Sequence, residues 1–372
     1  MKISERISKT IVMSVAAVMS VFGTVCVSAR FMNNIHTQDV QLAAVGLTMP
    51  DTMEQAQTLF NNSTKNTTNG TDAKISDLSI TTDFLLKEND LPDDTDLAVK
   101  DRTTDVDHTL EQSFLVTESL YRESNMSFDN FFVKNSTDLS IDIKTYISAK
   151  LPYTLENTTE PQVLIVHTHA TESYMEEDLG YYYESFYPRD TDDSYNVISV
   201  GNAIEKKLQQ SGIGVAHCTE HHDDPQYYGA YDNCADSINE YLKKYPTIKL
   251  VLDIHRDSIT TDEGEKYKPT FVYNGKKAAQ IMIMCGNENY GYYDFPNWED
   301  NLRLGLKLQN TAENKYPGMT RPLYFGNFMY NMNLGTTSLL IEVGSDANTL
   351  TEAQYTGELL GDVIATVLKS TV

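Results

Sequence analysis

The chain has 372 residues, enough for one or two domains with additional segments. Its formal net charge is -24 at pH 7, because 53 Asp and Glu residues outnumber 29 Lys and Arg residues. A charge of this sign argues against binding to nucleic-acid phosphates and is compatible with neutral, zwitterionic or basic partners. The four cysteines include no C-x-x-C pair, so a metal site built from cysteines is not expected.

Residues 1–30 are predicted to be a membrane or targeting segment. Lys2, Arg6 and Lys9 precede an apolar stretch, Ile11 to Ala29, that is just long enough to span a bilayer. Positive charge before such a stretch predicts a cytoplasmic N-terminus and an extracytoplasmic remainder of the chain. We expect an uncleaved single-pass anchor. The alternative is a cleaved signal, since Val-Ser-Ala at 27–29 resembles a cleavage site.

Residues 31–159 are predicted to be a polar, acidic spacer. Stretches such as 61–72 and 91–96 are rich in Asn, Thr and Asp and show no apolar period. Segments of this kind bury too little apolar surface to offset the loss of chain entropy, so we expect a largely disordered spacer. A short helix at 110–120 and a local element at 139–151 are expected exceptions, and neither is expected to build a core.

Residues 160–372 have the pattern of a folded domain. Apolar runs rich in Val, Ile and Leu alternate with amphipathic segments, and Asn274-Gly275 predicts a β-hairpin. This alternation predicts an α/β fold with a mostly parallel sheet flanked by helices, in which ligands bind beyond the carboxyl ends of the strands. The main strands are expected at 163–166, 213–218, 250–254 and 338–343, and the helices at 196–210, 230–244, 298–316 and 351–368.

Ionisable residues follow two of these strands. His167, His169 and Glu172 come after the first strand, and His255 comes after the strand at 250–254. A His and a Glu three residues apart can turn toward one metal ion if the chain bends where the strand ends. Two imidazoles and one carboxylate are a ligand set of catalytic zinc, which keeps its fourth position open. The sequence therefore predicts a Zn²⁺ site made by His169, Glu172 and His255, with His167 beside the ligands or in contact with substrate.

Further candidates lie next to this set. Asp253 and Asp257 flank His255 at alternate positions, and one of them is expected to hold its ring N–H. Glu342 lies within an apolar run, where a carboxylate is costly unless it is paired or bound. It is the candidate general base for water and general acid for the leaving group. Arg256 is expected to orient a substrate carbonyl or carboxylate, or to pair with Asp257.

Two weaker candidates lie in loops. Three histidines at 217, 221 and 222 surround Glu220 and Asp223, and we expect a solvated loop there rather than a second metal cluster. The tyrosines at 181–183 are expected either to pack within their loop or to form a wall that stacks on sugar or peptide. From the residues alone, the motifs together predict a metal-dependent hydrolase.

Five motifs resemble stage II sporulation protein P, in the order in which that family has them. They are the segments 163–174, 196–208, 251–258, 314–323 and 339–349. The resemblance covers roughly residues 163–368, and before them the chain is similar only in plan, with an anchor and a variable spacer. It implies a cell-wall hydrolase of endospore-forming bacteria that acts during engulfment and is similar in fold to zinc-dependent N-acetylmuramoyl-L-alanine amidases. It also implies stage II sporulation proteins D and M as partners.

The resemblance bears on the site residues as well. The two predicted imidazole ligands look like the zinc imidazoles of the family, and Glu342 looks like the catalytic glutamate of the amidase fold. The third ligand stays open, because the H-x-x-E spacing gives Glu172 and the wider amidase pattern gives Glu184 or Asp192. We favour Glu172.

The sequence predicts a membrane-anchored zinc amidase of peptidoglycan, with endopeptidase activity as a second possible activity. Its anchor is expected in the mother-cell membrane, with the catalytic domain, residues 160–372, in the intermembrane space of the sporangium. One alternative is a zinc carboxypeptidase or endopeptidase on stem peptides. Another is a non-catalytic scaffold that binds the cell wall.

Overall fold

The structure is a computed structural model that describes residues 111–120 and 122–370. The predicted anchor at 1–30 and the part of the predicted spacer before residue 111 lie outside the described residues. Among the helices that are described, none is both long and apolar enough to cross a membrane.

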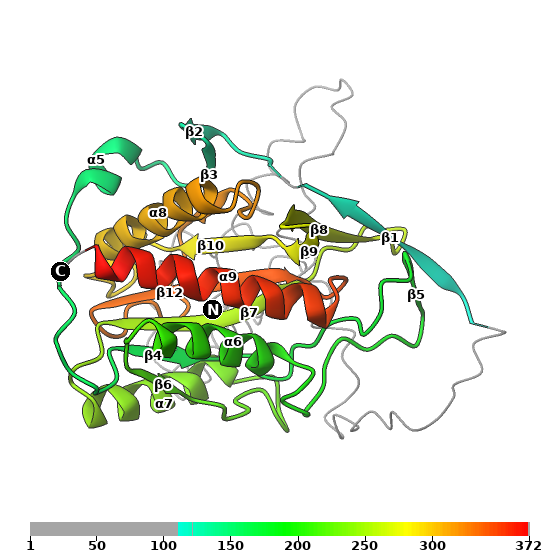
Figure 1. The fold of residues 1–372 in the computed structure, drawn as a ribbon, viewed down its shortest axis with the longest axis horizontal. Helices are drawn as coiled ribbons and strands as arrows, with labels where there is room; N and C mark the ends of the chain where they lie inside the picture. The colour runs from blue at the N-terminus through cyan, green and yellow to red at the C-terminus, as the bar shows by residue number, and fades with distance from the viewer. Residues whose placement is uncertain (1–110, 121, 371–372) are drawn as a thin grey trace, which may run out of the picture. The chain divides into compact units, whose positions relative to one another are not determined.

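The larger sheet carries the candidate site. Within the described part of the chain it has eight strands, and Figure 1 shows them as the centre of the fold. In spatial order they are β2 (Met126–Phe128), β3 (Phe131–Asn135), β11 (Leu323–Phe325), β10 (Ile281–Cys285), β12 (Thr337–Ser345), β7 (Leu250–Asp257), β4 (Val163–Val166) and β6 (Val215–His217).

The described residues also form a second, smaller sheet. Its four strands are, in spatial order, β5 (Tyr181–Tyr183), β1 (Ser113–Ser119), β8 (Lys266–Tyr273) and β9 (Lys276–Ala279). The hairpin predicted at Asn274-Gly275 is confirmed: β8 and β9 pair antiparallel, and both turn residues have positive φ, 49° and 73°.

The sheets are mixed, so the prediction of a mostly parallel sheet is wrong. β12, β7, β4 and β6 run parallel to one another, but β10 runs antiparallel to β12 and β2 runs antiparallel to β3. The hairpin is the physical reason for β10. It reverses the chain, and only Gln280 separates β9 from β10, so no crossover helix can restore the parallel direction.

Helices cover both faces of the larger sheet. In Figure 1, α6, α8 and α9 lie over one face. Alternate residues of β4 serve the two faces, because Val163 and Ile165 pack in the core cluster of these helices, whereas Leu164 and Val166 pack with residues of α7. The four predicted helices are confirmed within two residues, and a short fifth one precedes them: α5 (Ile143–Ser148), α6 (Val197–Gln210), α7 (Ala230–Lys244), α8 (Trp298–Lys315) and α9 (Leu350–Lys369).

Residues 111–159 differ from the expected spacer. They form β1, β2, β3 and α5, and Phe131, Val133 and Ile143 belong to the main core cluster. The segment at 113–119, where a helix was expected, is a strand that pairs with β5 and β8. The partners of these short strands lie far along the chain, as β3 pairs with β11, so local periodicity gives little sign of them.

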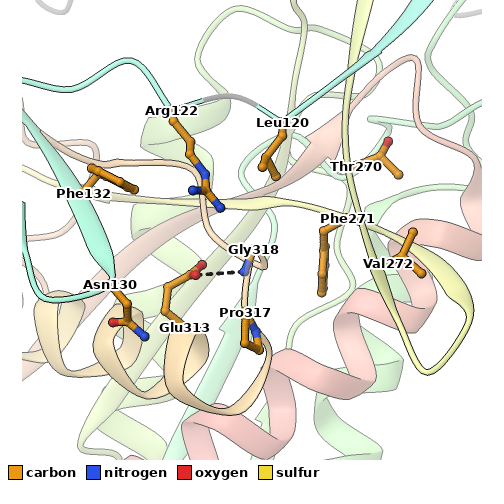
Figure 2. A pocket seen from close by; sticks show the side chains of 10 residues that line it. All are labelled: Leu120, Arg122, Asn130, Phe132, Thr270, Phe271, Val272, Glu313, Pro317 and Gly318. Carbon is orange, nitrogen blue, oxygen red and sulfur yellow. Dashed lines mark hydrogen bonds between the residues drawn. The ribbon is translucent and has the colours of Figure 1, made fainter.

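A cavity of about 580 Å³ lies away from the predicted site residues. It is lined by side chains of β3 and β8 and by the end of α8, and Figure 2 shows Arg122, Phe132 and Phe271 around it. Glu313, also in its wall, accepts a hydrogen bond of 2.9 Å from the backbone N–H of Gly318, which closes the turn after α8.

Candidate metal centre

The carboxyl ends of β4, β7 and β12 meet at one edge of the larger sheet. Val166 of β4 is the register partner of Asp253 in β7, and His255 of β7 is the register partner of Glu342 in β12. Parallel neighbours thus bring residues about 90 positions apart to the same level of the sheet. β7 extends to residue 257, so His255 lies within the strand rather than after it.

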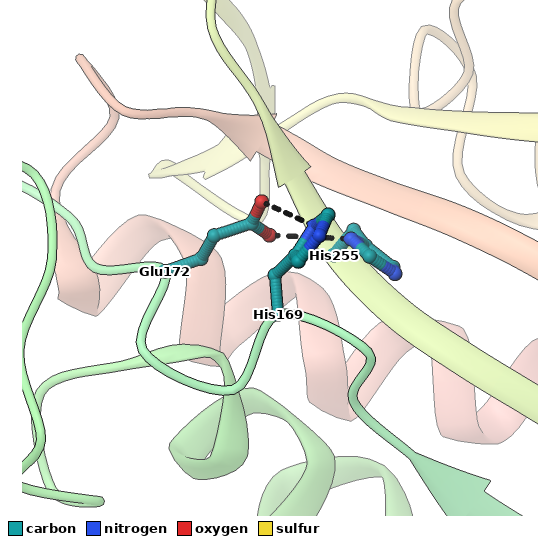
Figure 3. Close-up of side chains that lie close together, drawn as sticks. All are labelled: His169, Glu172 and His255. Atoms are coloured by element: carbon teal, nitrogen blue, oxygen red, sulfur yellow. Dashed lines mark ion pairs between the residues drawn. The ribbon is translucent and has the colours of Figure 1, made fainter. Parts of the chain in front are cut away.

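Three predicted ligands converge at this edge. After β4 the chain turns, and the backbone N–H of Glu172 donates to the carbonyl of His169 over 3.1 Å. The Glu172 carboxylate faces both imidazoles from one side, with Oε1 3.5 Å from Nδ1 of His169 and Oε2 3.4 Å from Nδ1 of His255 (Figure 3). All three residues are buried.

These distances fit a small metal ion. In a tetrahedral zinc site with bonds of about 2.0–2.2 Å, neighbouring ligand atoms are about 3.3–3.5 Å apart. The three ligand atoms lie within 4.8 Å of one another, and the two nitrogen–oxygen distances, 3.5 Å to Oε1 and 3.4 Å to Oε2 of the same carboxylate, are close to that spacing. Two imidazoles and a carboxylate at this spacing are a suitable donor set for zinc.

Asp253 occupies the far side of His255. Its Oδ1 lies 3.0 Å from Nε2 of His255, and its two oxygens accept hydrogen bonds from the backbone N–H and the hydroxyl of Thr168. A carboxylate at this ion-pair distance increases the basicity of the imidazole. Asp253, together with Glu172, holds the pKa of His255 well above its ordinary value although burial opposes this, so metal at Nδ1 displaces a proton and binding weakens as the pH falls.

Arg256 and Asp257 have other contacts than those expected. Arg256 donates from its backbone N–H to Glu172 and from its guanidinium to the carbonyls of Ser173 and Pro188. It therefore fastens to β7 the loop after β4 that carries His169 and Glu172, which we call the ligand loop. The Asp257 carboxylate accepts from Arg321 over 2.7 Å, so of the two acids that flank His255 it is Asp253 that faces the ring.

His167 lies behind the ligands and is fully buried. Its Nδ1 is 2.9 Å from the carbonyl of Ile254, which can only accept, so Nδ1 carries the proton and Nε2 accepts from His217 over 2.9 Å. Burial lowers the pKa of His167 to about 3, which keeps the ring neutral. His167 thus ties the beginning of the ligand loop to β7 and β6 rather than joining the three ligands.

Glu342 lies beside the ligands with an unsatisfied oxygen. Its Oε2 is buried and has no hydrogen-bond partner. A bulge follows it in β12, and Gly344 takes a positive φ of 71° there; a side chain at that position would collide with Asn348 and Ala279. The bulge at Gly344 thus ends the regular pairing of β12 with β7 next to the candidate ligands, and bulges are common beside active sites.

The model of the stage II sporulation protein P (SpoIIP) family matches residues 38–365. The chain belongs to this family. Stage II sporulation protein P of Bacillus subtilis (strain 168) is 28% identical over 217 residues, which are 55% of this chain and 50% of the relative. The chain thus spans about half the length of the curated relative that it matches.

Two solved amidases are similar to this SpoIIP-family chain at a low level. The N-acetylmuramoyl-L-alanine amidase AmiC2 of Nostoc punctiforme is 13% identical, with a TM-score of 0.34, and the match covers 58% of this chain and 98% of the amidase. The N-acetylmuramoyl-L-alanine amidase of Clostridium difficile 630 is 17% identical, with a TM-score of 0.34 and coverage of 57% and 97%. Likeness at this level does not fix an activity.

The alternative carboxylates lie elsewhere in this SpoIIP-family member. Glu184 is exposed just after β5, and the Asp192 carboxylate accepts a hydrogen bond of 2.9 Å from the backbone N–H of Ser194. Within residues 111–120 and 122–370, the group of ligand atoms that contains His169 and His255 takes its carboxylate from Glu172.

The loop after β6 contacts and supports the ligand loop. Nothing in the sequence indicated this contact. Asp223 is buried and accepts hydrogen bonds from the backbone N–H and hydroxyl of Thr171 and from Arg189. Two tyrosines were missed as well: the ring of His169 stacks on Tyr227 at 4.5 Å and meets the edge of Tyr231 at 5.5 Å. The local sequence 219–229 has no apolar period that could have indicated burial.

Glu342→Gln is expected to stabilise the metal-free protein more at high pH than at low pH. Burial, followed by the charge of Asp257, raises the pKa of Glu342 from 4.5 to about 8. The folded state therefore holds a proton that the unfolded chain releases, and the favourable contribution present below pH 4.5 is lost as the pH rises through 8. The variant should gain up to about 5 kcal/mol relative to the wild type between pH 4.5 and pH 9.

Urea unfolding of chelator-treated protein at both pH values measures this difference. The matched control is Glu358→Gln, which removes an exposed glutamate of α9. An equal effect of Glu342→Gln at pH 4.5 and 9 would contradict the raised pKa.

Proposed function

We propose that this protein is a zinc-dependent peptidoglycan hydrolase that cleaves the amide between the lactyl group of muramic acid and the stem peptide. The observation that carries the proposal is the convergence of His169, Glu172 and His255 with the unsatisfied Glu342 at one buried edge of the sheet. Membership of the SpoIIP family supports a cell-wall substrate and a role in sporulation.

The donor set supports a catalytic rather than a structural ion. Structural zinc sites have four protein ligands, whereas catalytic sites have three and leave one position for water or substrate. When bound, zinc acidifies water and polarises the carbonyl of the scissile amide. With Asp253 3.0 Å from Nε2 of His255, Nδ1 is the ring nitrogen that would be left to hold the ion.

Glu342 supplies the proton transfers. Its carboxylate removes a proton from the attacking water as the water oxygen adds to the amide carbon, and the same carboxyl protonates the nitrogen as the carbon–nitrogen bond breaks. The products are a free lactyl carboxylate and an amine. A buried carboxyl with a raised pKa is suited to both roles near neutral pH, because it is neither permanently ionised nor permanently protonated.

We further propose that residues 1–30 anchor the protein in the mother-cell membrane and that the catalytic domain acts in the intermembrane space during engulfment. The positive charges before the apolar stretch support this orientation. We also propose stage II sporulation proteins D and M as partners, which rests on the family resemblance of the sequence motifs.

Muropeptide analysis tests the proposed activity. Purified protein incubated with sacculi is expected to release intact stem peptides and to leave free lactyl groups on the glycan, and a chelator is expected to stop the release until zinc is added back. Products cut within the stem peptide would instead identify a carboxypeptidase or endopeptidase. The absence of any product, with no zinc in the folded protein, would favour a non-catalytic scaffold.

A further inference from the structure

A second group of potential ligands lies in the loop after β6. Cys218, Glu220 and His222 each offer one ligand atom, and the three atoms lie within 4.8 Å of one another. They form a C-x-E-x-H sequence, which places a thiol, a carboxylate and an imidazole at alternate positions. Cys218 and His222 are buried, and Glu220 is exposed, so the group is closed on one side and open to solvent on the other.

The His222 ring presents a lone pair to this group. Its Nδ1 lies 2.8 Å from the carbonyl of His167, which can only accept, so Nδ1 carries the proton. In the neutral ring, Nε2 is then unprotonated, and it lies 2.9 Å from the hydroxyl of Ser237. A backbone carbonyl that holds one ring N–H while the other nitrogen faces the ion is the usual support of a metal-binding histidine.

Two of the three proposed ligands lie around a single hydroxyl. Ser237 Oγ is 2.9 Å from His222 Nε2 and donates to Glu220 Oε2 over 3.3 Å. One hydroxyl proton cannot serve an imidazole lone pair and a carboxylate at the same time. When the hydroxyl donates to Glu220, it leaves the Nε2 lone pair of the buried His222 available to a cation.

We propose that Cys218, Glu220 and His222 form a second metal site, which takes a divalent ion of the zinc class and is separate from the centre at His169. Sulfur and imidazole nitrogen select such ions over Ca²⁺ and Mg²⁺, which require mainly oxygen ligands. On binding, the thiol releases its proton to solvent and the thiolate becomes the ligand. Ser237 or water from the open side fills the remaining position.

The site would fasten the loop that carries the first set of ligands. His222 is hydrogen-bonded to the carbonyl of His167, two residues before His169, and the adjacent Asp223 binds Thr171. An ion held by the loop after β6 therefore stiffens both contacts with the ligand loop. The inference does not depend on the proposed amidase activity, because binding and loop stiffening are independent of what the first centre does.

Cobalt substitution tests the proposal without any activity assay. Metal-free full-length protein is titrated with Co²⁺, and the near-ultraviolet charge-transfer absorption of a cobalt–thiolate bond is recorded. The centre at His169 has no sulfur ligand, so this absorption reports only on a cysteine site. The wild type is expected to show it, His255→Gln is expected to keep it, and Cys218→Ser is expected to lose it.

The other buried cysteines provide matched controls. Cys285→Ser and Cys234→Ser, which remove a thiol from β10 and α7, are expected to retain the absorption. Because Cys218→Ser can also disturb packing, the exposed Glu220→Gln is the second variant, with an expected loss of at least about 10-fold in cobalt affinity. Absence of the absorption in the cobalt-loaded wild type, or its persistence in Cys218→Ser, would overturn the proposal.

Discussion

Glu342→Gln is expected to lower kcat for stem-peptide release by about 10²–10⁴-fold while leaving the zinc content of the protein unchanged. The amide of Gln has nearly the shape of the carboxyl group but cannot take a proton from water or return one to the leaving nitrogen. Glu342 lies beside the ligands rather than among them, since the grouped ligand atoms come from His169, Glu172 and His255. The substitution should therefore remove a catalytic function without removing a ligand.

Two measurements make this prediction decisive. Turnover on purified sacculi and zinc content by metal analysis are compared for the variant, the wild type and Glu358→Gln, the exposed control in α9. Release of stem peptides at a tenth of the wild-type rate or more would exclude Glu342 as the proton-transfer group. Loss of zinc together with activity would instead make Glu342 a ligand.

The parallel part of the sheet made much of the site predictable. Each of β4, β7 and β12 is buried on both faces, so its sequence is a continuous apolar run, and ionisable residues at its end stand out. Parallel neighbours end at the same edge, which is why His169, His255 and Glu342 could be expected near one another. Helix boundaries were also predictable where the chain supplies a cap, as Asn196 does for α6.

Contacts that depend on distant partners were not predictable. Asp253 and Asp257 are both two residues from His255 on one strand, and the sequence cannot choose between them. The choice is made by Thr168, which positions Asp253, and by Arg321, which engages Asp257 from another part of the chain. The strands at 113–135 likewise depend on partners such as β8 and β11, which come more than 130 residues later.

The role of Glu172 as the third ligand depends on both its spacing from His169 and a turn of the chain between them. H-x-x-E predicts a ligand only if the chain turns between the two residues, and the hydrogen bond from the N–H of Glu172 to the carbonyl of His169 is that turn. Arg256 then holds Oε2 of Glu172 through its backbone N–H over 3.0 Å, which directs the carboxylate toward His255. Neither contact could be inferred from the residue types alone.

Glu172→Gln is accordingly expected to weaken zinc binding by more than about 100-fold, which exceeds the usual effect of losing a group that only supports a ligand. The Gln oxygen can still accept from Arg256, so the loop should keep its shape while the charge that faces both imidazoles is lost. Zinc affinity is measured by competition with a chromophoric chelator, and folding by thermal unfolding of the metal-free protein.

Glu184→Gln and Asp192→Asn are the matched controls, because they remove the same charge from the two alternative carboxylates. Both residues are exposed, and both variants should bind zinc like the wild type. A loss of zinc in either variant, with Glu172→Gln unaffected, would assign the ligand role to that carboxylate. The segment between β5 and α6 would then have to move toward His169. Zinc lost only in Glu172→Gln would mean that the turn after β4 alone supplies two of the three ligands, so the centre is assembled from one loop and one strand.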